Sequence, residues 1–391
     1  MPSAGGLAHF SNESGGRRQL TEMEAFVRPG VSAQARTLAA KWYLSDGAFR
    51  AEQARIFARE WNCVGHESRI ARAGDYFLAT VAGESLIIVR DESGEVHALY
   101  NVCRHRGTRL CEGGDAHANG VIQCPYHAWT YAYDGALLAA RNMQDVAGFD
   151  PADYPLKRAA LRVIEGFIFV SLEDGSPESA PPVLALRSRL VRWNTAGLRE
   201  ARRIPYELAC NWKLVFQNYS ECYHCPVIHP QLERLSPSDS GRNDFSEGPV
   251  LGGYSDLRPG TGGLTTTGST ARPLLGSVEG LDARRSYYYS VFPSLLLSLH
   301  PDLVMIHTIR PIAPDRTQVD CVFLFDAETM ERPEFDPSDA VEFWDLTNRQ
   351  DWRVNELTYA GITSRAYEPG PYAHAEGLLH AFDRHYLKTM A

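Results

Sequence analysis

The sequence predicts an α+β protein, in which a small antiparallel β-domain precedes a larger domain with an antiparallel sheet flanked by helices. Two observations predict this class. Short runs rich in β-branched and aromatic residues, separated by turn residues, recur through 61–173 and again through 286–325. Longer segments with a helical pattern follow the second group, at 337–360 and 373–390. Strands and helices that come in separate groups are typical of α+β proteins.

The composition excludes several classes of protein. The chain has 391 residues, a formal net charge of −9 and 44% hydrophobic residues, as an ordinary globular protein does. A nucleic-acid binder would be basic, and no run of eighteen apolar residues is present to span a membrane. Because the N-terminus has no charged-then-apolar export signal, we expect a cytoplasmic protein. In that reducing compartment the eight cysteines are expected to be buried, metal-binding or catalytic rather than a disulfide framework.

The first half of the chain divides where the composition changes. Residues 1–44 are predicted to be a loose N-terminal arm, because 1–35 are rich in Gly, Ser and Ala and lack an apolar period. A helix capped by Ser45 is expected over 45–60, packed on the larger domain. The small β-domain is placed at 61–173, with strands at 76–81, 85–90, 96–100 and 167–172.

The larger domain, 183–391, follows a linker rich in Pro and Ser. We expect a helix over 183–195, a strand over 201–210, and then a helix that carries a metal-binding motif. Residues 234–281 are rich in Gly, Ser, Thr and Pro and are predicted to be a lid or a disordered loop. Four strands of the antiparallel sheet are expected at 286–291, 294–300, 303–311 and 317–325.

A first metal-binding pattern lies in the small domain. It is C-x-H followed by C-x-x-H, formed by Cys103, His105, Cys124 and His127. Two thiolates and two imidazoles could hold zinc, or a [2Fe–2S] cluster with the cysteines on one iron and the histidines on the other. The cluster is favoured because each pair follows a strand directly and carries a turn former, Gly107 or Pro125. Trp129 is expected to shield it.

A second pattern lies in the larger domain, where His224 and His229 stand five residues apart. On a regular helix they would point roughly 140° apart, but Pro226 between them disrupts a helix. A helix that ends near His224, with His229 on the following turn, can bring both rings to one ion. One carboxylate would complete a facial triad for Fe(II) with positions left open for dioxygen. The alternative is a pair of core histidines.

Together these motifs resemble the α subunits of Rieske non-haem iron oxygenases, which include ring-hydroxylating dioxygenases and their monooxygenase and demethylase relatives. The resemblance also rests on Asn211-Trp212-Lys213 and on Asn218-Tyr219-x-Glu221-x-Tyr223-His224, and it spans about 45–390. It implies a Rieske [2Fe–2S] domain at 61–173 and a catalytic domain with mononuclear Fe(II).

The resemblance further implies two acidic site residues. The third iron ligand would be an aspartate on the late helix, matched by Asp351, with Asp345, Glu342 and Glu356 as competing carboxylates. Glu221 stands where the family has an acidic residue that bridges the cluster histidine of one subunit to the iron histidine of the next. Many dioxygenases have Asp there. The alternative is that Glu221 only orients His224.

The function implied is that of a terminal oxygenase, which uses O2 and electrons from a flavin or iron–sulfur reductase, or a ferredoxin, to hydroxylate or N-demethylate a small molecule. Electron transfer between head-to-tail subunits implies a homotrimer. Glu221 and the run 343–352 resemble choline and glycine-betaine monooxygenases, whose substrates would bind aromatic rings through cation–π contacts.

Aromatic and histidine residues available for such contacts, although equally typical of a strand core, are Tyr219, Tyr287, Tyr288, Tyr289, Phe292, His300 and His307. The alternatives are a ring-dihydroxylating dioxygenase for an aromatic acid or hydrocarbon, a Rieske electron carrier without oxygenase activity, and a zinc-stabilised binding module.

Overall fold

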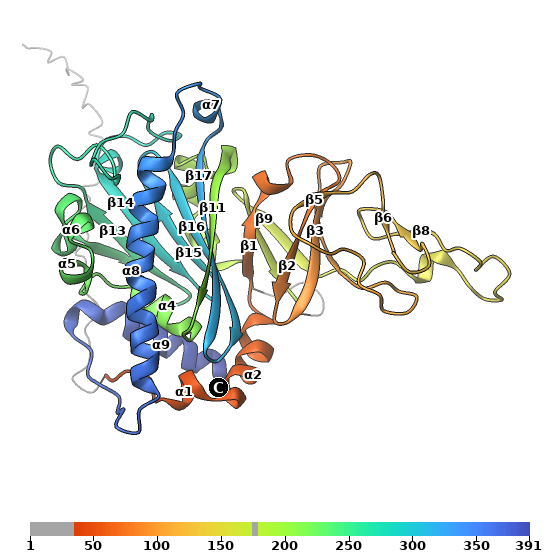
Figure 1. Ribbon diagram of the computed structural model, residues 1–391, viewed down its shortest axis with the longest axis horizontal. Helices are drawn as coiled ribbons and strands as arrows, with labels where there is room; N and C mark the ends of the chain where they lie inside the picture. Colours follow the sequence, from red (N-terminus) through yellow and green to blue (C-terminus); the bar gives the residue numbers. More distant parts are fainter. Residues whose placement is uncertain (1–34, 174–178) are drawn as a thin grey trace, which may run out of the picture.

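The computed structural model describes residues 35–173 and 179–391 (Figure 1). Most of the expected arm, and the middle of the expected linker, lie outside these ranges. The described chain enters through α1 (Lys41–Leu44) and α2 (Asp46–Glu52). Ser45 caps α2 as predicted, because its Oγ accepts hydrogen bonds from the N–H groups of Gly47 and Ala48 at 3.1 and 3.3 Å. A π-helical turn, Gln53–Phe57, continues α2.

The small domain contains three short antiparallel sheets. The first has the order β1-β10-β9, the second β4-β3-β2-β5 and the third β6-β7-β8. The predicted strands at 76–81, 85–90, 96–100 and 167–172 correspond to β2, β3, β4 and β10. The bounds are β1 Asn62–His66, β2 Asp75–Val81, β3 Glu84–Arg90, β4 Val96–Tyr100, β5 Ala116–His117, β6 Ile122–Gln123, β7 Thr130–Tyr131, β8 Leu137–Ala139, β9 Ala160–Ile164 and β10 Phe167–Ser171.

The larger domain is built on one seven-stranded antiparallel sheet with the order β11-β17-β16-β15-β14-β13-β12. The four strands predicted between 286 and 325 form its centre. The bounds are β11 Leu198–Leu208, β12 Arg242–Phe245, β13 Val250–Asp256, β14 Arg285–Val291, β15 Leu295–Leu299, β16 Val304–Ala313 and β17 Arg316–Asp326.

One prediction was wrong at the edge of this sheet. Residues 234–281 were expected to lack strands, yet β12 and β13 lie in that stretch and extend the sheet beyond β14. Gly252 and Gly253 resemble a loop sequence, but each is needed where neighbouring strands come close. A Cβ atom on Gly252 would lie 2.0 Å from the carbonyl oxygen of Tyr288, and one on Gly253 would lie 1.9 Å from that of Arg242.

Helices cover one face of the large sheet, with α8 (Ser338–Ile362) lying along it in Figure 1. Beside it are α4 (Trp212–Tyr219) and the C-terminal α9 (Gly377–Met390). The other face packs on the small domain and on α3 (Arg187–Arg192) through residues that include Trp61, Phe167 and Trp193. In the described ranges, no helix combines the length and apolarity needed to cross a membrane.

A buried ion pair fixes the start of α4. Lys213 and Glu52 are both fully buried, and Nζ of Lys213 lies 2.5 Å from Oε1 of Glu52. Glu52 also accepts hydrogen bonds from Trp212 Nε1–H at 2.9 Å and from the Tyr386 hydroxyl at 2.6 Å. A buried charge is tolerated only when it is paired and hydrogen-bonded. This cluster therefore ties α2, α4 and α9 together immediately before the iron-type motif.

Candidate metal centres

A loop and the short helix α5 (Cys225–Ile228) lie between α4 and α6 (Pro230–Leu235), and they bring two histidines together. The helix expected to end near His224 ends at Tyr219 instead. Pro226 lies in the first turn of the four-residue α5, where its missing N–H breaks no helical bond. His224 immediately precedes α5 and His229 follows it, so their ring centroids come within 5.1 Å.

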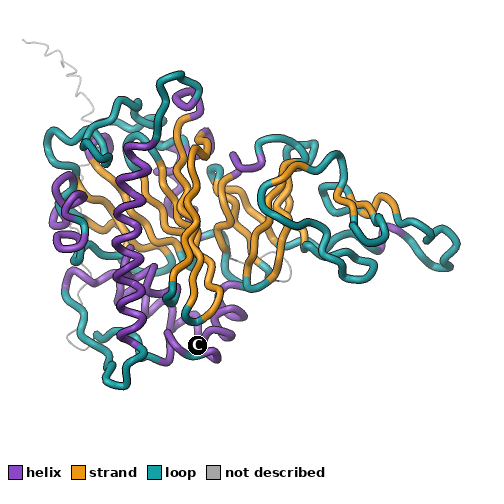
Figure 2. Tube along the Cα trace, in the orientation of Figure 1, coloured by secondary structure: helices purple, strands orange, loops and turns teal. Residues whose placement is uncertain are grey.

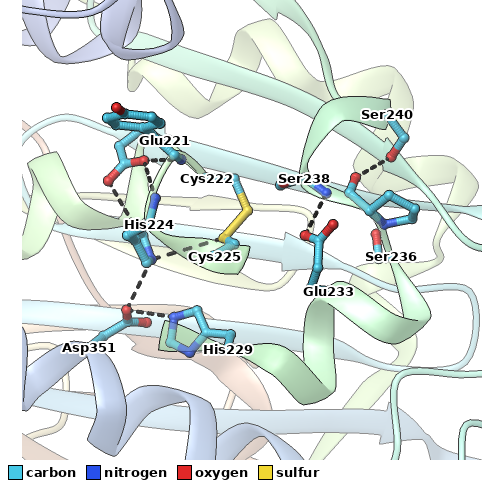
Figure 3. Close-up of a disulfide and its surroundings, with 12 residues drawn as sticks. Glu221, Cys222, His224, Cys225, His229, Glu233, Ser236, Ser238, Ser240 and Asp351 are labelled. Atoms are coloured by element: carbon cyan, nitrogen blue, oxygen red, sulfur yellow. Dashed lines mark hydrogen bonds and ion pairs between the residues drawn. A yellow bond between two sulfur atoms is a disulfide. The ribbon is translucent and has the colours of Figure 1, made fainter. Parts of the chain in front are cut away.

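Asp351 on α8 completes a group of three ligand-type side chains (Figure 3). Its Oδ1 lies 2.8 Å from Nε2 of His229 and 3.2 Å from Nε2 of His224. Two of the competing carboxylates are engaged elsewhere: Asp345 accepts a hydrogen bond from Tyr206, and Glu356 accepts one from a backbone N–H at the end of β11. The structure thus brings together His224, His229 and Asp351.

The remaining ring nitrogens show how the imidazoles are oriented. Nδ1–H of His224 donates to Oε1 of Glu221 at 2.6 Å, and Nδ1–H of His229 donates to the side-chain oxygen of Gln350 at 2.8 Å. Both acceptors are oxygens, so each ring carries a proton on Nδ1 and presents Nε2 to Asp351. This is the arrangement in which histidine binds a metal ion.

Charge in the group also fits a cation. Burial opposes protonation of His224, but Asp351 and Glu221 outweigh it and raise its pKa to about 10. Burial alone would raise the pKa of Asp351, yet the two histidines lower it. The carboxylate therefore attracts positive charge to the point between the three side chains. Two imidazoles and one carboxylate with open positions are the donor set of a non-haem Fe(II) site.

The first motif forms two similar loops at the narrow end of the molecule, where Figure 2 shows mostly loops and short strands. Each loop closes on its cysteine: Gly107 N–H donates to the carbonyl of Cys103 at 3.0 Å, and Ala128 N–H to that of Cys124 at 3.1 Å. Gly107 has φ +76° and Ala128 has φ +57°. Both predicted turn formers lie in these loops, and in the second loop the left-handed residue is Ala128, at the end of the turn that contains Pro125.

The four ligand-type residues of these loops divide into an inner and an outer pair. Cys103 and Cys124 are each only 3% exposed, whereas His105 is exposed and its ring centroid lies 4.9 Å from that of His127. Trp129 is buried and stacks on His105 at 4.9 Å, as its predicted shielding role requires. Buried sulfurs beneath surface imidazoles suit a two-iron cluster with its histidine iron outward.

A single zinc ion does not fit these loops. Among the described residues, three ligand atoms come within 4.8 Å of one another only in His224–His229–Asp351 and in an Asp91–Glu95–His97 group elsewhere. The second group is a hydrogen-bonded turn, in which Asp91 already accepts bonds from Ser93, Glu95 and His97. A tetrahedral zinc site would need all four Cys and His ligands at one point.

Comparison with known proteins agrees with this geometry. The family model for the catalytic domain of ring-hydroxylating α subunits matches residues 195–391, and the model for the Rieske [2Fe-2S] domain matches residues 60–150. The carnitine monooxygenase oxygenase subunit of Escherichia coli (strain K12) is 32% identical over 342 residues, which cover 85% of this chain and 86% of that protein. The chain belongs to the ring-hydroxylating α-subunit family of Rieske oxygenases.

Two further relatives have similar coverage. The glycine betaine monooxygenase oxygenase subunit of Pseudomonas aeruginosa (strain UCBPP-PA14) is 29% identical over 369 residues, 85% of this chain and 83% of the relative. The crystal structure of the quaternary ammonium Rieske monooxygenase CntA with L-carnitine has a TM-score of 0.74 at 26% identity and covers 93% of this chain and 96% of its own.

This Rieske oxygenase subunit therefore has a [2Fe–2S] cluster and a mononuclear iron as cofactors, as the sequence predicted. Because a catalytic domain accompanies the Rieske domain, the alternatives of a simple electron carrier and of a zinc-stabilised module are removed. The chain is the iron-dependent terminal oxygenase component of its system.

A cavity of about 500 Å³ opens beside the three ligand-type side chains of this oxygenase. Two of the nominated aromatic residues, Tyr219 and Tyr288, line it, and their ring centroids are 6.3 Å apart. Trp344 on α8 also lines it, 6.3 Å from Tyr288. Sequence reasoning missed the role of Trp344, although its helical spacing of seven residues from Asp351 places both on one face of α8.

Of the other nominated residues, His307 alone lines the cavity. Tyr287 and Tyr289 point to the opposite face of the sheet, and Phe292 packs on Trp212 and Phe382. His307 lines the cavity, with Nε2 3.1 Å from Oδ1 of Asn348, whereas His300 stacks on Trp344 outside the lining. Burial lowers the pKa of His300 to about 3 and that of His307 to about 4, so both rings are neutral.

Proposed function

We propose that this oxygenase subunit hydroxylates a small quaternary ammonium compound. A trimethylammonium group offers no hydrogen-bond donor and is recognised by the faces of aromatic rings. Tyr219 from α4, Tyr288 from β14 and Trp344 from α8 bring such rings to the cavity that also exposes Asp351. Relatives named for glycine betaine, carnitine and choline support the same class of substrate.

We assign the iron to His224, His229 and Asp351, and the cluster to Cys103, His105, Cys124 and His127. Iron bound in this donor set supplies the dioxygen chemistry. The side chains around it have a positioning role. Glu221 and Gln350 fix the two imidazole rings through Nδ1, and the aromatic rings hold the cation so that a neighbouring C–H bond faces the centre.

Electrons from a reductase or ferredoxin are proposed to pass between subunits. Figure 1 supports this, because the loops around β6 that hold the proposed cluster ligands lie at the opposite end of the molecule from α5 and α6. A head-to-tail ring, most simply a homotrimer, would bring the exposed His105–His127 edge of one subunit to Glu221 of the next. Glu221 is half-buried beside the cavity, as a bridging carboxylate requires. A cytoplasmic location stays a prediction.

The substrate class is tested by substrate-coupled oxygen uptake of the iron-loaded subunit with a reductase. Methylammonium compounds, among them L-carnitine, glycine betaine and choline, are compared with aromatic acids, and released formaldehyde is measured to detect demethylation. Coupled uptake with a quaternary ammonium compound is the expected result. Uptake coupled only to an aromatic acid, with a dihydrodiol as product, would instead establish the ring-dihydroxylating alternative.

The aromatic site itself is tested at Tyr288. Tyr288→Leu removes a ring face from the cavity, so KM for the ammonium substrate should rise about tenfold, since a desolvated cation–π contact contributes about 1–2 kcal/mol. Tyr288→Phe keeps the ring and serves as the matched control, with KM near that of the wild type. Equal KM values for the Leu and Phe variants would exclude this ring from cation binding.

A further inference from the structure

The loop between α4 and α5 contains a disulfide that the sequence analysis did not assign. Cys222 and Cys225 are joined, with Cα atoms 5.0 Å apart, and the link encloses His224 (Figure 3). Sγ of Cys225 lies 4.0 Å from Nε2 of His224. The other six cysteines, all within the described ranges, are buried and form no disulfide. The one disulfide among the described residues therefore joins the two residues that flank a stretch containing a proposed iron ligand, His224.

Apart from the buried Cys225 and the hydrogen bonds that Val227 and Ile228 N–H donate to the carbonyl of His224, little else holds this loop in place. Tyr223 is 65% exposed and Val227 is 81% exposed, so neither anchors the loop in the core. The loop backbone is held by the Glu221 carboxylate, which accepts N–H bonds from Tyr223 and His224, and by a 3.2 Å bond from Cys225 N–H to the carbonyl of Cys222. A segment with few buried contacts opens easily, and a covalent link restricts the open states available to it.

We propose that the Cys222–Cys225 disulfide is a positioning device for His224 and Glu221, and that its reduction releases the loop that carries them. In the oxidised form the link keeps Nδ1 of His224 on Glu221 and Nε2 toward Asp351. After reduction, iron is held less tightly and electron transfer through Glu221 slows. This inference rests on the roles proposed above for these side chains.

The redox step is a thiol–disulfide exchange with a dithiol protein of the thioredoxin class. A thiolate of that protein attacks one sulfur of the link, and its second thiol then resolves the mixed disulfide. Both cysteines line the cavity, and Cys222 is the half that can be attacked because it is half-buried whereas Cys225 is buried. Cys222 and Cys225 gain two electrons and two protons as thiols, and the dithiol protein loses them. In a reducing compartment disulfides are typically of this transient, redox-active kind.

The test uses the whole iron-loaded subunit under anaerobic conditions, before and after incubation with reduced thioredoxin. Differential alkylation and mass spectrometry map the state of Cys222 and Cys225. After reduction, iron affinity measured by chelator competition should fall about tenfold, as for loss of other contacts that orient metal ligands. The visible spectrum of the Rieske cluster should stay unchanged, because the cluster lies in the other domain. Reoxidation should restore the iron affinity.

Variants exclude a direct effect of the reductant. Cys222→Ser/Cys225→Ser should behave like the reduced wild type and should not recover on oxidation. Cys63→Ala, which removes a buried free cysteine on β1, should behave like the oxidised wild type. The proposal would be overturned if the double variant bound iron with wild-type affinity and its reduced Rieske cluster passed electrons to the iron at the wild-type rate. So would free thiols at both positions in fully iron-loaded, active protein.

A parallel Asp351→Ala variant separates this inference from the proposed function. If Asp351→Ala loses iron while the double cysteine variant keeps it at wild-type affinity, only the positioning role of the disulfide fails. If Asp351→Ala also keeps its iron, the proposed ligand set fails, and the inference about the loop fails with it.

Discussion

At the scale of single residues, the iron-type site depends on which atom of each imidazole carries the proton. Glu221 and Gln350 accept the Nδ1 protons of His224 and His229, and this leaves both Nε2 atoms facing Asp351. Neither acceptor is a metal ligand in our assignment, yet each decides the direction in which Nε2 of its histidine points. Substitutions at the acceptors should therefore differ in effect from substitutions at the ligands.

Glu221→Gln keeps an oxygen that can accept from Nδ1–H of His224 but removes the negative charge. We expect the [2Fe–2S] cluster and the mononuclear iron to stay bound. Electron transfer from the cluster to the iron should slow by at least about tenfold. The rate is measured in a single turnover, from reoxidation of the reduced cluster in the presence of substrate and O2. Glu331→Gln, at an exposed ion pair with Arg199, is the control. An unchanged rate in the Glu221 variant would remove the bridging role.

Asp351→Ala removes the carboxylate that faces both histidines. Mononuclear iron should be lost while the visible spectrum of the cluster is retained, since the cluster ligands lie in the other domain. Metal analysis then gives about two iron atoms per chain instead of three. Asp345→Ala, six residues earlier on α8 and bonded to Tyr206, should keep all three. Three iron atoms in the Asp351 variant would move the third ligand elsewhere.

At the scale of elements, α4 connects the buried charge cluster at its start with the metal-binding loop at its end. Lys213 and Glu52 are paired without solvent, and Tyr386 of α9 adds a hydrogen bond to Glu52. Burial lowers the pKa of Lys213 to about 8 although Glu52 opposes this change. The pair positions α4 between α2 and α9, and it stabilises the fold only while both charges are present.

Lys213→Met should leave the carboxylate of Glu52 buried without its charge partner. The expected loss is about 3–5 kcal/mol of unfolding free energy, measured by denaturant unfolding of the subunit. The double variant Lys213→Met/Glu52→Gln removes both charges and should recover much of this loss. A single variant as stable as the wild type would show that α4 does not depend on the ion pair.

At the scale of the whole molecule, the proposed electron path needs two subunits. Two inactive variants should therefore complement each other: His105→Ala, which damages the cluster, and Asp351→Ala, which damages the iron site. Subunits of both kinds, differently tagged and co-expressed, can form mixed rings in which an intact cluster faces an intact iron site. Activity of the purified mixed assembly should clearly exceed that of either variant alone. No recovery in verified mixed assemblies would place the path within one chain.

The local patterns of the sequence predicted much of this structure. Runs rich in β-branched and aromatic residues, separated by turn residues, marked β2, β3 and β4, and a serine before a helical pattern marked the start of α2. The spacing of Cys and His identified both motifs, because ligands in tight loops must be close in sequence. These features depend on a few neighbouring residues, so a single sequence contains the information.

Other features depend on distant contacts. The glycine pair of β13 is part of a strand only because β12 and β14 press close on either side. Asp351 could be chosen among the late carboxylates only by family likeness, and packing of α8 on α4 brings it to the histidines. The role of Trp344 in the cavity was missed for the same reason. The Cys222–Cys225 link, by contrast, joins residues only three positions apart, and it was missed because a reducing compartment was expected.

The sequence by itself determined the α+β class, the two metal-binding motifs and the family to which the chain is similar, since these follow from residue type and short spacing. Only the tertiary structure decided which carboxylate meets the histidines, which aromatic rings enclose the cavity and how far the cluster loops lie from the iron-type site. Those relations join residues that lie far apart in the sequence, and they arise from how the sheet, α8 and the small domain pack together.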